Sequence, residues 1–190
     1  MSRITKVISW GMMVAMIACA DTAVAEPSVA HTDLELRLGA EYVCGTCGPE
    51  RLRATAQVFA DRLFPVTRLG NGTLEVGPYV KGALLDGGHV PQIAGGALLG
   101  YRVGAYEVLV NTGLAYATER IGSTASPDSG QTKLTYDLGL SLRYDINNQY
   151  FLSGGYGHNS NGHAMGLDFI GGKGSNPGID SWLIGVGVHF

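Results

Sequence analysis

The chain has few charged residues and, beyond its first 25 positions, no long hydrophobic segment. Asp, Glu, Lys and Arg make up 15% of its 190 residues, whereas about 25% is usual in a soluble domain. The formal net charge is −3, so we expect no basic surface and no nucleic-acid partner. After Ala25 no apolar run is long enough for a membrane-spanning helix. The 29 glycines and low charge favour a sheet protein in an apolar solvent, and the length suits one domain.

The N-terminus has the pattern of a secretory signal peptide. A positively charged start at residues 2–6 precedes an apolar stretch over residues 7–18, which is too short to span a membrane. The small residues of "AVA" then place a cleavage site after Ala25. An alternative takes "MIAC" as a lipobox with Cys19 lipidated, but the usual Leu three residues before that cysteine is missing. We therefore expect residues 1–25 to form a cleaved signal peptide.

Cysteine is scarce in the remaining chain. Cys44 and Cys47 stand in "VCGTCGPE", a spacing that in a cytosolic βαβ protein would indicate thioredoxin-like redox chemistry. The signal peptide implies export, no βαβ pattern surrounds the pair, and Gly and Pro flank it. We therefore favour a small loop disulfide that forms in an oxidising compartment. A zinc site would need two further ligands at matching spacing, and the sequence offers none.

The rest of the chain alternates apolar and polar residues, which is the pattern of β-strands. In "KLTYDLGLSLRYDI" (133–146) every even position is apolar or aromatic, and every odd position is small or polar. Similar strands are predicted at 33–43, 106–118 and 180–190, and weaker ones at 52–64, 73–85, 91–103 and 149–160. The segment 52–64 could also be drawn as a short amphipathic helix. Turn motifs separate the segments at 70–72, 86–88, 126–130 and 146–148, which gives eight strands.

These strands fit a membrane barrel better than a soluble one. Their apolar faces carry tyrosine near the ends, as in an aromatic girdle, while the opposite faces mix Gly with charges that could pair inside a narrow lumen. The chain ends on Phe190 with apolar residues at every second position before it, which resembles the C-terminal signature of bacterial outer-membrane barrels. We predict an all-β fold: an eight-stranded antiparallel transmembrane β-barrel of the outer-membrane type, formed by residues 26–190 as a single domain. A soluble lipocalin-like barrel is the alternative.

Polar residues interrupt the apolar face near the ends of the last two predicted strands. In "YGHNSNGH" (156–163), His158 and Ser160 share the face of Leu152, and Asp180 continues the apolar face of the last strand. The two strands are antiparallel neighbours, so the three polar side chains should meet on the outer wall, where they are costly unless they pair. A serine becomes a nucleophile when an imidazole takes its proton and a carboxylate orients the imidazole. The pattern indicates a catalytic triad of Ser160, His158 and Asp180, with a purely structural polar strand end as the alternative.

These motifs resemble those of the lipid A 3-O-deacylases of Gram-negative outer membranes, the PagL-type or acyloxyacyl hydrolase-like enzymes. Here "HNSN" is similar to the family's His-x-Ser-Asn, and "NPGIDSW" is similar to its Asn followed by Gly-Ile-Glu-Ser. The resemblance implies that Ser160 is the nucleophile, His158 the base and Asp180 the third member. It also implies an oxyanion hole, for which the candidates are Asn161, Asn176 and backbone amides near Gly162.

The sequence departs from that family in two ways. Asp180 stands where the family commonly has Glu and is one methylene shorter, so we expect a looser orienting contact or a shifted strand. The connection over residues 162–178 is longer than in the family. A metal site would have to combine His158 with His163 and Asp168, but loop histidines are usually just solvated and the family needs no metal. Neither a metal nor a cofactor is therefore expected.

The resemblance implies a serine esterase in the bacterial outer membrane, with its site facing the outer leaflet. Its reaction would remove the 3-O-linked 3-hydroxyacyl chain from lipid A of lipopolysaccharide, which is then the partner to expect, and a homodimer is left open. The alternatives are a phospholipase with the same residues and a non-enzymatic barrel that serves adhesion or envelope structure.

Overall fold

The computed structural model describes residues 29–44, 52–85, 88, 90–121, 132–160 and 178–190. They form eight strands: β1 (His31–Cys44), β2 (Leu52–Leu69), β3 (Gly72–Leu85), β4 (Val90–Val103), β5 (Tyr106–Ile121), β6 (Thr132–Asp145), β7 (Tyr150–Ser160) and β8 (Gly178–His189). No described segment is a helix long and apolar enough to cross a membrane. The predicted signal peptide, the alternative lipobox cysteine Cys19, and Cys47 lie outside the described residues.

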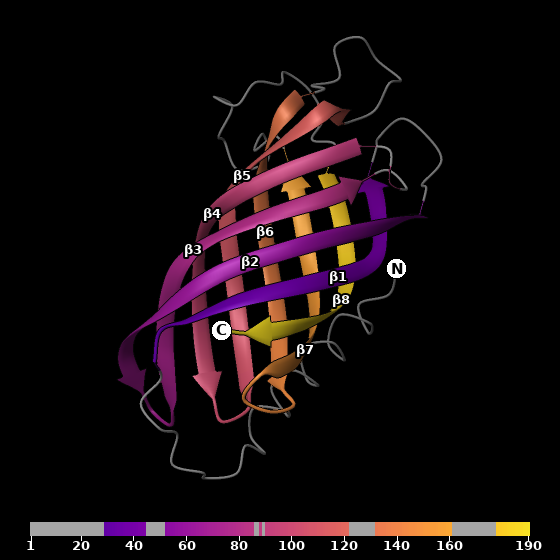
Figure 1. Cartoon of the computed structure of the whole chain (residues 1–190). Coiled ribbons are helices and arrows are strands. Elements are labelled where there is room, and N and C mark those ends of the chain that lie inside the picture. Colours follow the sequence, from indigo (N-terminus) through magenta and orange to yellow (C-terminus); the bar gives the residue numbers. More distant parts are fainter. Residues whose placement is uncertain (1–28, 45–51, 86–87, 89, 122–131, 161–177) are drawn as a thin grey trace, which may run out of the picture.

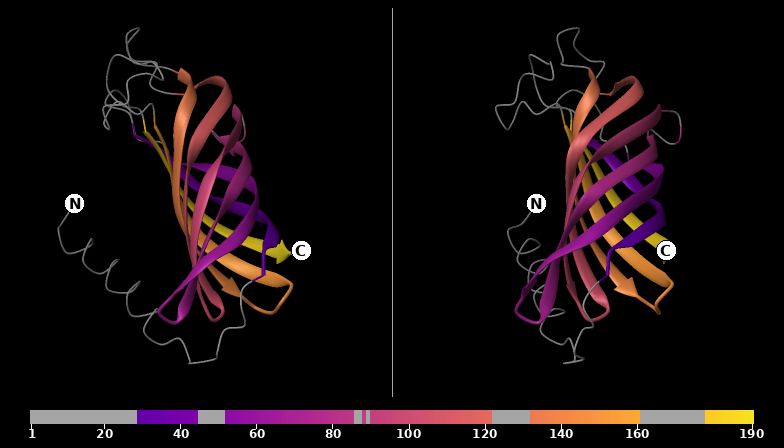
Figure 2. Two further views of the ribbon diagram at one scale, coloured as in Figure 1. Left: turned by 90° about the vertical axis from the view of Figure 1, so that its left-hand side faces the viewer. Right: turned by 60° about the vertical axis from the view of Figure 1, so that its left-hand side comes forward.

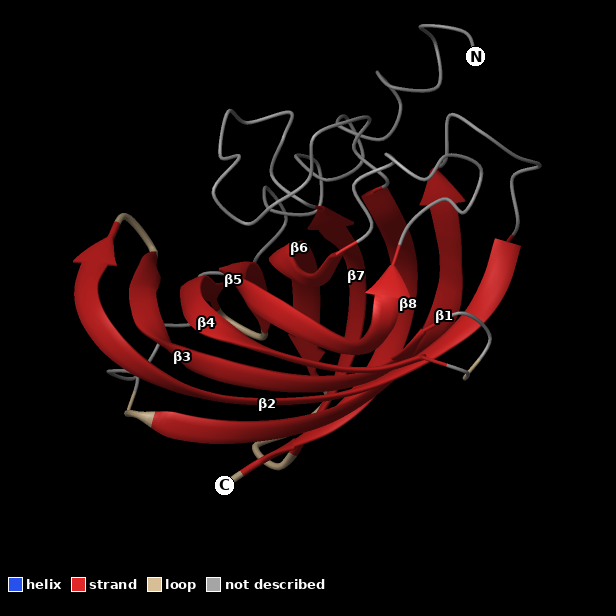
Figure 3. Ribbon diagram, turned by 90° about the horizontal axis from the view of Figure 1, so that it is seen from above, coloured by secondary structure: helices blue, strands red, loops and turns tan. Residues whose placement is uncertain are grey.

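The strands form one closed ring in which each strand pairs with its neighbours in the sequence. The order is β1-β2-β3-β4-β5-β6-β7-β8, and the ring closes because β1 also pairs antiparallel with β8, with Leu34 opposite Val188 and Leu38 opposite Ile184 (Figure 1). Seen along the barrel, the strands enclose a single lumen (Figure 3). The eight predicted strands are confirmed, and residues 52–64 belong to β2 rather than to a helix.

The connections differ in length between the two ends of the barrel. Strands β2–β3, β4–β5 and β6–β7 are joined by the short turns 70–71, 104–105 and 146–149, while the other connections are 45–51, 86–89, 122–131 and 161–177. The short turns lie at the lower end in Figure 2. Gly70 and Gly104 have φ angles of 59° and 56°, which suit tight hairpins because only glycine adopts positive φ without strain. We call the two ends the short-turn end and the long-connection end.

The outer wall is apolar and the lumen is polar, as β1 illustrates. Leu34, Leu36 and Leu38 are exposed, whereas the alternating residues Asp33, Glu35 and Arg37 are buried. A soluble barrel buries its apolar face and exposes its polar one, so this distribution is that of a membrane barrel. The prediction of a transmembrane β-barrel of the outer-membrane type is confirmed, and the soluble lipocalin-like alternative is not.

A network of buried ion pairs fills the lumen between its centre and the short-turn end. Arg143 of β6 lies at its centre, 2.7 Å from Asp33, 2.5 Å from Asp61 and 3.2 Å from Glu35. The guanidinium carbon also lies 4.7 Å from the centre of the Phe151 ring. A Cβ atom on Gly187 would come within 2.1 Å of Phe151, so luminal glycines leave the room that these large side chains occupy.

We predict that Arg143→Ala destabilises the barrel by about 3–5 kcal/mol, because several buried carboxylates lose their shared cation. Urea unfolding of the protein in lipid vesicles, followed by tryptophan fluorescence, measures this change. Arg62→Ala is the matched control, since Arg62 is exposed on the outside of β2 and its loss should change stability by less than about 1 kcal/mol. Equal losses in both variants would contradict the central role of Arg143.

Candidate functional site

The candidate site lies on the outer wall where β7 and β8 approach the long-connection end. His158 of β7 is the Cα partner of Asp180 on β8 and of Leu138 on β6, and Asp180 is also the partner of Tyr42 on β1. All four side chains point to the outside of their strands, because they alternate with buried luminal residues such as Asn159 and Ser181. His158 and Asp180 are therefore polar side chains on the outer wall, next to the apolar Leu138 and the aromatic Tyr42.

His158 and Asp180 form a direct hydrogen bond across the two strands. His158 Nδ1 lies 2.7 Å from Asp180 Oδ1, and the two side chains are 28% and 23% exposed. The shorter acid does not loosen this contact, contrary to the expectation from the sequence. Direct cross-strand partners have Cβ atoms only about 4.5–5.5 Å apart, so an aspartate reaches the ring without a shift of the strand. With Nδ1–H donating to Asp180, Nε2 is the basic nitrogen of His158.

Tyr156 is a further residue of the site, and the sequence analysis did not select it. Its O–H donates a hydrogen bond to Oδ1 of Asp180, the same oxygen that accepts from His158. Tyr156 precedes His158 by two residues on the same face, and its ring lies 5.9 Å from that of Trp182. Tyrosine is common near the ends of membrane-spanning strands, so the sequence pattern did not distinguish Tyr156 from the other tyrosines of the aromatic girdle. Two donors thus hold one carboxylate oxygen on the wall.

Ser160 is the last residue of β7. It is the Cα partner of Tyr136 on β6 and occupies the next outward position after His158. Same-face residues two apart in a strand have Cα atoms about 6.6 Å apart, a separation that a histidine and a serine side chain can bridge. Ser160 is only 2% exposed. The candidate oxyanion residues Asn161, Gly162 and Asn176 lie outside the described residues, as do His163 and Asp168.

An open pocket adjoins His158 on the wall formed by β5, β6 and β7. Its volume is about 540 Å³, and its lining is mostly apolar and outward-facing: Val110, Thr112, Leu138, Leu140, Tyr156 and His158, with Asn111 and Gly139 beneath them. An alkyl chain would find apolar contacts along this pocket and reach the imidazole at its edge.

The arrangement combines a base, an acid that orients it, and a hydroxyl on the same face, next to an apolar pocket. Polar side chains on a lipid-facing wall cost free energy, and mutual hydrogen bonding of His158, Asp180 and Tyr156 offsets part of this cost. Among the described residues, groups of three metal-ligating side chains occur in the lumen and not at this site. An imidazole, an orienting carboxylate and a hydroxyl on one face can support acid–base and nucleophilic chemistry.

Comparisons with solved structures agree with the fold. The crystal structure of the outer membrane enzyme PagL is similar, with a TM-score of 0.60 and 15% sequence identity over 82% of this chain and 98% of that chain. The attachment invasion locus protein Ail of Yersinia pestis, solved with the heparin analogue sucrose octasulfate, has a TM-score of 0.51 and 9% identity over 86% of this chain and 100% of that chain. No protein-family model and no curated protein matches. The chain is an eight-stranded transmembrane β-barrel with the fold of outer-membrane proteins.

We predict that lipid acyl chains surround the candidate site. Trp182, next to Tyr156 on the outer wall, is 51% exposed and should be quenched by brominated acyl chains after refolding into vesicles. Cleavage after Ala25 removes Trp10, so Trp182 is the single tryptophan of a protein refolded from residues 26–190. Aqueous iodide on the same sample is the control and should quench weakly. Strong quenching by iodide with none by brominated lipid would show that this wall faces water.

Proposed function

We propose that this protein is an esterase of the bacterial outer membrane that removes the 3-O-linked 3-hydroxyacyl chain from lipid A of lipopolysaccharide. The observation that carries the proposal is the 2.7 Å hydrogen bond between His158 and Asp180 on a wall that otherwise faces acyl chains. The outer-membrane fold that the chain shares with PagL and Ail supports the location, and the resemblance of "HNSN" and "NPGIDSW" to the deacylase motifs supports the reaction.

In the proposed reaction Ser160 is the nucleophile. His158 Nε2 takes the hydroxyl proton while Oγ attacks the ester carbonyl carbon, and Asp180 stabilises the imidazolium through Nδ1–H. Asn161, Asn176 and backbone amides near Gly162 donate to the oxyanion of the tetrahedral intermediate. Collapse breaks the bond to the sugar oxygen, which receives the proton from His158. Water activated by the same imidazole then releases the hydroxy fatty acid from Ser160.

The place of the site on the barrel matches a substrate held in the outer leaflet. Barrels of this type have short turns on the periplasmic side and longer loops outside, and His158 and Asp180 lie toward the long-connection end. The apolar pocket beside His158 is the candidate site for an acyl chain of the substrate. Ser160 is almost fully buried, so in this proposal the substrate displaces the atoms that cover the hydroxyl when it binds.

We predict that Ser160→Ala abolishes deacylation, because the alanine side chain has no hydroxyl to attack the ester. Refolded protein is incubated with lipopolysaccharide, and the lipid A mass spectrum is recorded together with the released acids. The wild type should remove the mass of one 3-hydroxyacyl chain, and the variant should match a protein-free sample. An active Ser160→Ala protein would exclude this mechanism.

The matched control is Ser153→Ala, since Ser153 lies on the same strand but faces the lumen, where its hydroxyl donates to Glu35. This variant should retain deacylation. Heat-modifiable electrophoretic mobility verifies that both variants form barrels. The same assay with mixed phospholipids and lipopolysaccharide separates a lipid A deacylase from a phospholipase by the acids released. A folded wild type that releases no acid from either lipid would favour the non-enzymatic barrel.

We predict a smaller effect from Tyr156→Phe, which keeps the ring but removes the hydrogen bond to Asp180. One hydrogen bond contributes about 1 kcal/mol, so kcat should fall about fivefold while KM changes little, because Tyr156 orients the acid through its hydroxyl. Steady-state kinetics on a short-chain ester in detergent measure both constants. A change in KM alone would assign Tyr156 to substrate binding instead.

A further inference from the structure

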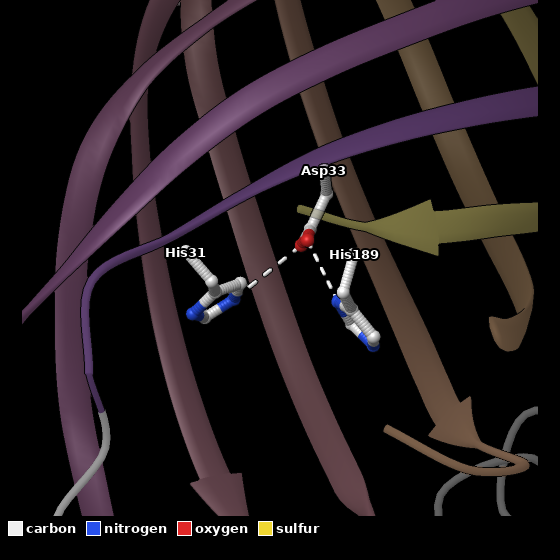
Figure 4. Close-up of side chains that lie close together, drawn as sticks. All are labelled: His31, Asp33 and His189. Atoms are coloured by element: carbon white, nitrogen blue, oxygen red, sulfur yellow. Dashed lines mark hydrogen bonds and ion pairs between the residues drawn. The ribbon is translucent and has the colours of Figure 1, made fainter. Parts of the chain in front are cut away.

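A second group of histidine and aspartate side chains lies in the lumen at the short-turn end, where β1 and β8 close the barrel. His31 and Asp33 lie two residues apart on β1, and His189 on β8 is the Cα partner of Asp33. Figure 4 shows both imidazole rings directed at the Asp33 carboxylate, and one ligand atom from each of the three residues lies within 4.8 Å of the others. We propose that His31, Asp33 and His189 bind a divalent transition-metal cation, with Zn²⁺ as the best fit to their nitrogen and oxygen ligands.

In each imidazole ring, the nitrogen that points away from Asp33 lies near a hydrogen-bond acceptor. His31 Nδ1 lies 3.3 Å from the backbone oxygen of Val29, and His189 Nε2 lies 3.1 Å from Asp145 Oδ1. With N–H groups on these nitrogens, His31 Nε2 and His189 Nδ1 direct lone pairs toward the carboxylate of Asp33. Metal-binding histidines are held in this way, with the second ring N–H donated to a carboxylate or a backbone carbonyl.

The distances suit a tetrahedral cation with a small adjustment. Ligand bonds of about 2.0–2.1 Å place neighbouring ligand atoms about 3.3 Å apart, and His31 Nε2 lies 3.4 Å from Asp33 Oδ2. His189 Nδ1 and Asp33 Oδ1 are 2.7 Å apart, which is a hydrogen-bond distance, so a proton joins them when no cation is bound. The cation displaces that proton, and because the two nitrogens face different oxygens of Asp33, the carboxylate must offer one oxygen to the cation or bind it through both. Three protein ligands leave a fourth position for water.

The surrounding charges favour an added cation. Among the described residues, the ion pairs of this network join six carboxylates to three guanidinium groups: Asp33, Glu35, Asp61, Glu75, Glu107 and Asp145 against Arg37, Arg102 and Arg143. His31 and His189 add positive charge only when protonated. Arg102 lies 3.1 Å from His31 Nε2, but it is also paired with Glu75, Glu107 and Asp145. Arg102 therefore remains paired with three carboxylates when the cation binds His31. The side chains of His31 and His189 are 16% and 12% exposed, so the cation can enter from the aqueous end.

The ligands belong to the first and last strands, so the bound cation would stabilise the pairing of β1 with β8 that closes the barrel. Since the site exists only when β1 and β8 are paired, binding should stabilise the folded state according to the concentration of the ion relative to its Kd. This consequence is independent of the esterase reaction, because the proposed metal site lies inside the barrel and near its opposite end.

The test uses refolded barrel without a polyhistidine tag. Zn²⁺ is titrated in competition with a chromophoric chelator, and Co²⁺ replaces it to record the visible absorption of a tetrahedral site. We expect one equivalent of tightly bound Zn²⁺ per barrel and at least tenfold weaker binding in His31→Gln and in His189→Gln. Zn²⁺ should raise the unfolding temperature of the wild type but not of these two variants. Asp145→Asn, which removes the negative charge that Asp145 presents to His189 and to Arg102, should weaken binding about 10–100-fold.

His158→Gln is the matched control, because it removes a histidine from the outer wall and leaves the luminal site intact. Its zinc affinity should equal that of the wild type. Heat-modifiable mobility verifies that each variant has folded. A folded wild type without equimolar tight binding, or a Zn²⁺ affinity that is lost in His158→Gln but kept in His31→Gln and His189→Gln, overturns the proposal.

Discussion

The structure depends on the burial of charge inside a ring whose outside is apolar. Arg143 reaches from β6 across the lumen to carboxylates on β1 and β2, and so ties opposite walls together through the interior. Such buried ion pairs are stable only when every partner is present, and closure of the sheet leaves no strand edge through which water could enter. Near the centre, Lys81 and Tyr79 bind Asp137 in the same manner. The lumen is therefore a core packed with paired charges and with buried apolar side chains such as Phe59 and Leu109, rather than a channel.

The candidate esterase site differs from the surrounding outer wall because it carries hydrogen-bonded polar side chains where the neighbouring positions are apolar or aromatic. His158, Tyr156 and Asp180 satisfy one another through a single carboxylate oxygen, which limits the cost of exposing them to acyl chains. The buried residues Asn159 and Ser181 neighbour His158 and Asp180 in sequence and face the lumen. At this level of the barrel, both the outer and the inner face of β7 and β8 therefore carry polar side chains. A wall built only for stability would carry aliphatic or aromatic residues here, which is why the exception has functional weight.

Among the described residues, histidine and aspartate meet at two places, on the outer wall and in the lumen, and their surroundings give them different chemistry. On the wall, His158 has one carboxylate partner and adjoins an apolar pocket, which suits a base that acts on a lipid ester. In the lumen, His189 lies between Asp33 and Asp145 with a second histidine close by, which suits a cation that must lose part of its hydration shell. The residue types are the same, while the number of ligands and access to water differ.

Much of the architecture follows from local periodicity in the sequence. Alternation over 33–43 and 133–146 fixes which residues face outward, and it correctly predicts that Glu35, Arg37 and Arg143 are luminal. The alternation is weakest at 52–64, where only the pairing with β1 and β3 establishes β2 as a strand. The turn motifs recognised in the sequence do not include the hairpin at Gly104. The face of His158 and Asp180 was predictable for the same reason as that of Leu152 and Trp182.

The partners across strands were decided by the tertiary structure. A period of two determines the face of a side chain, but sliding β8 by two residues past β7 would keep every face and separate Asp180 from His158. The stagger of a closed ring sets that register, and all eight strands contribute to it. The same closure brings His31 near the start of the barrel to His189 near its end, an encounter that no local pattern contains. The sequence by itself determined inside and outside, because alternation is a property of each strand, whereas the contacts that carry chemistry arose from the way in which the strands close on one another.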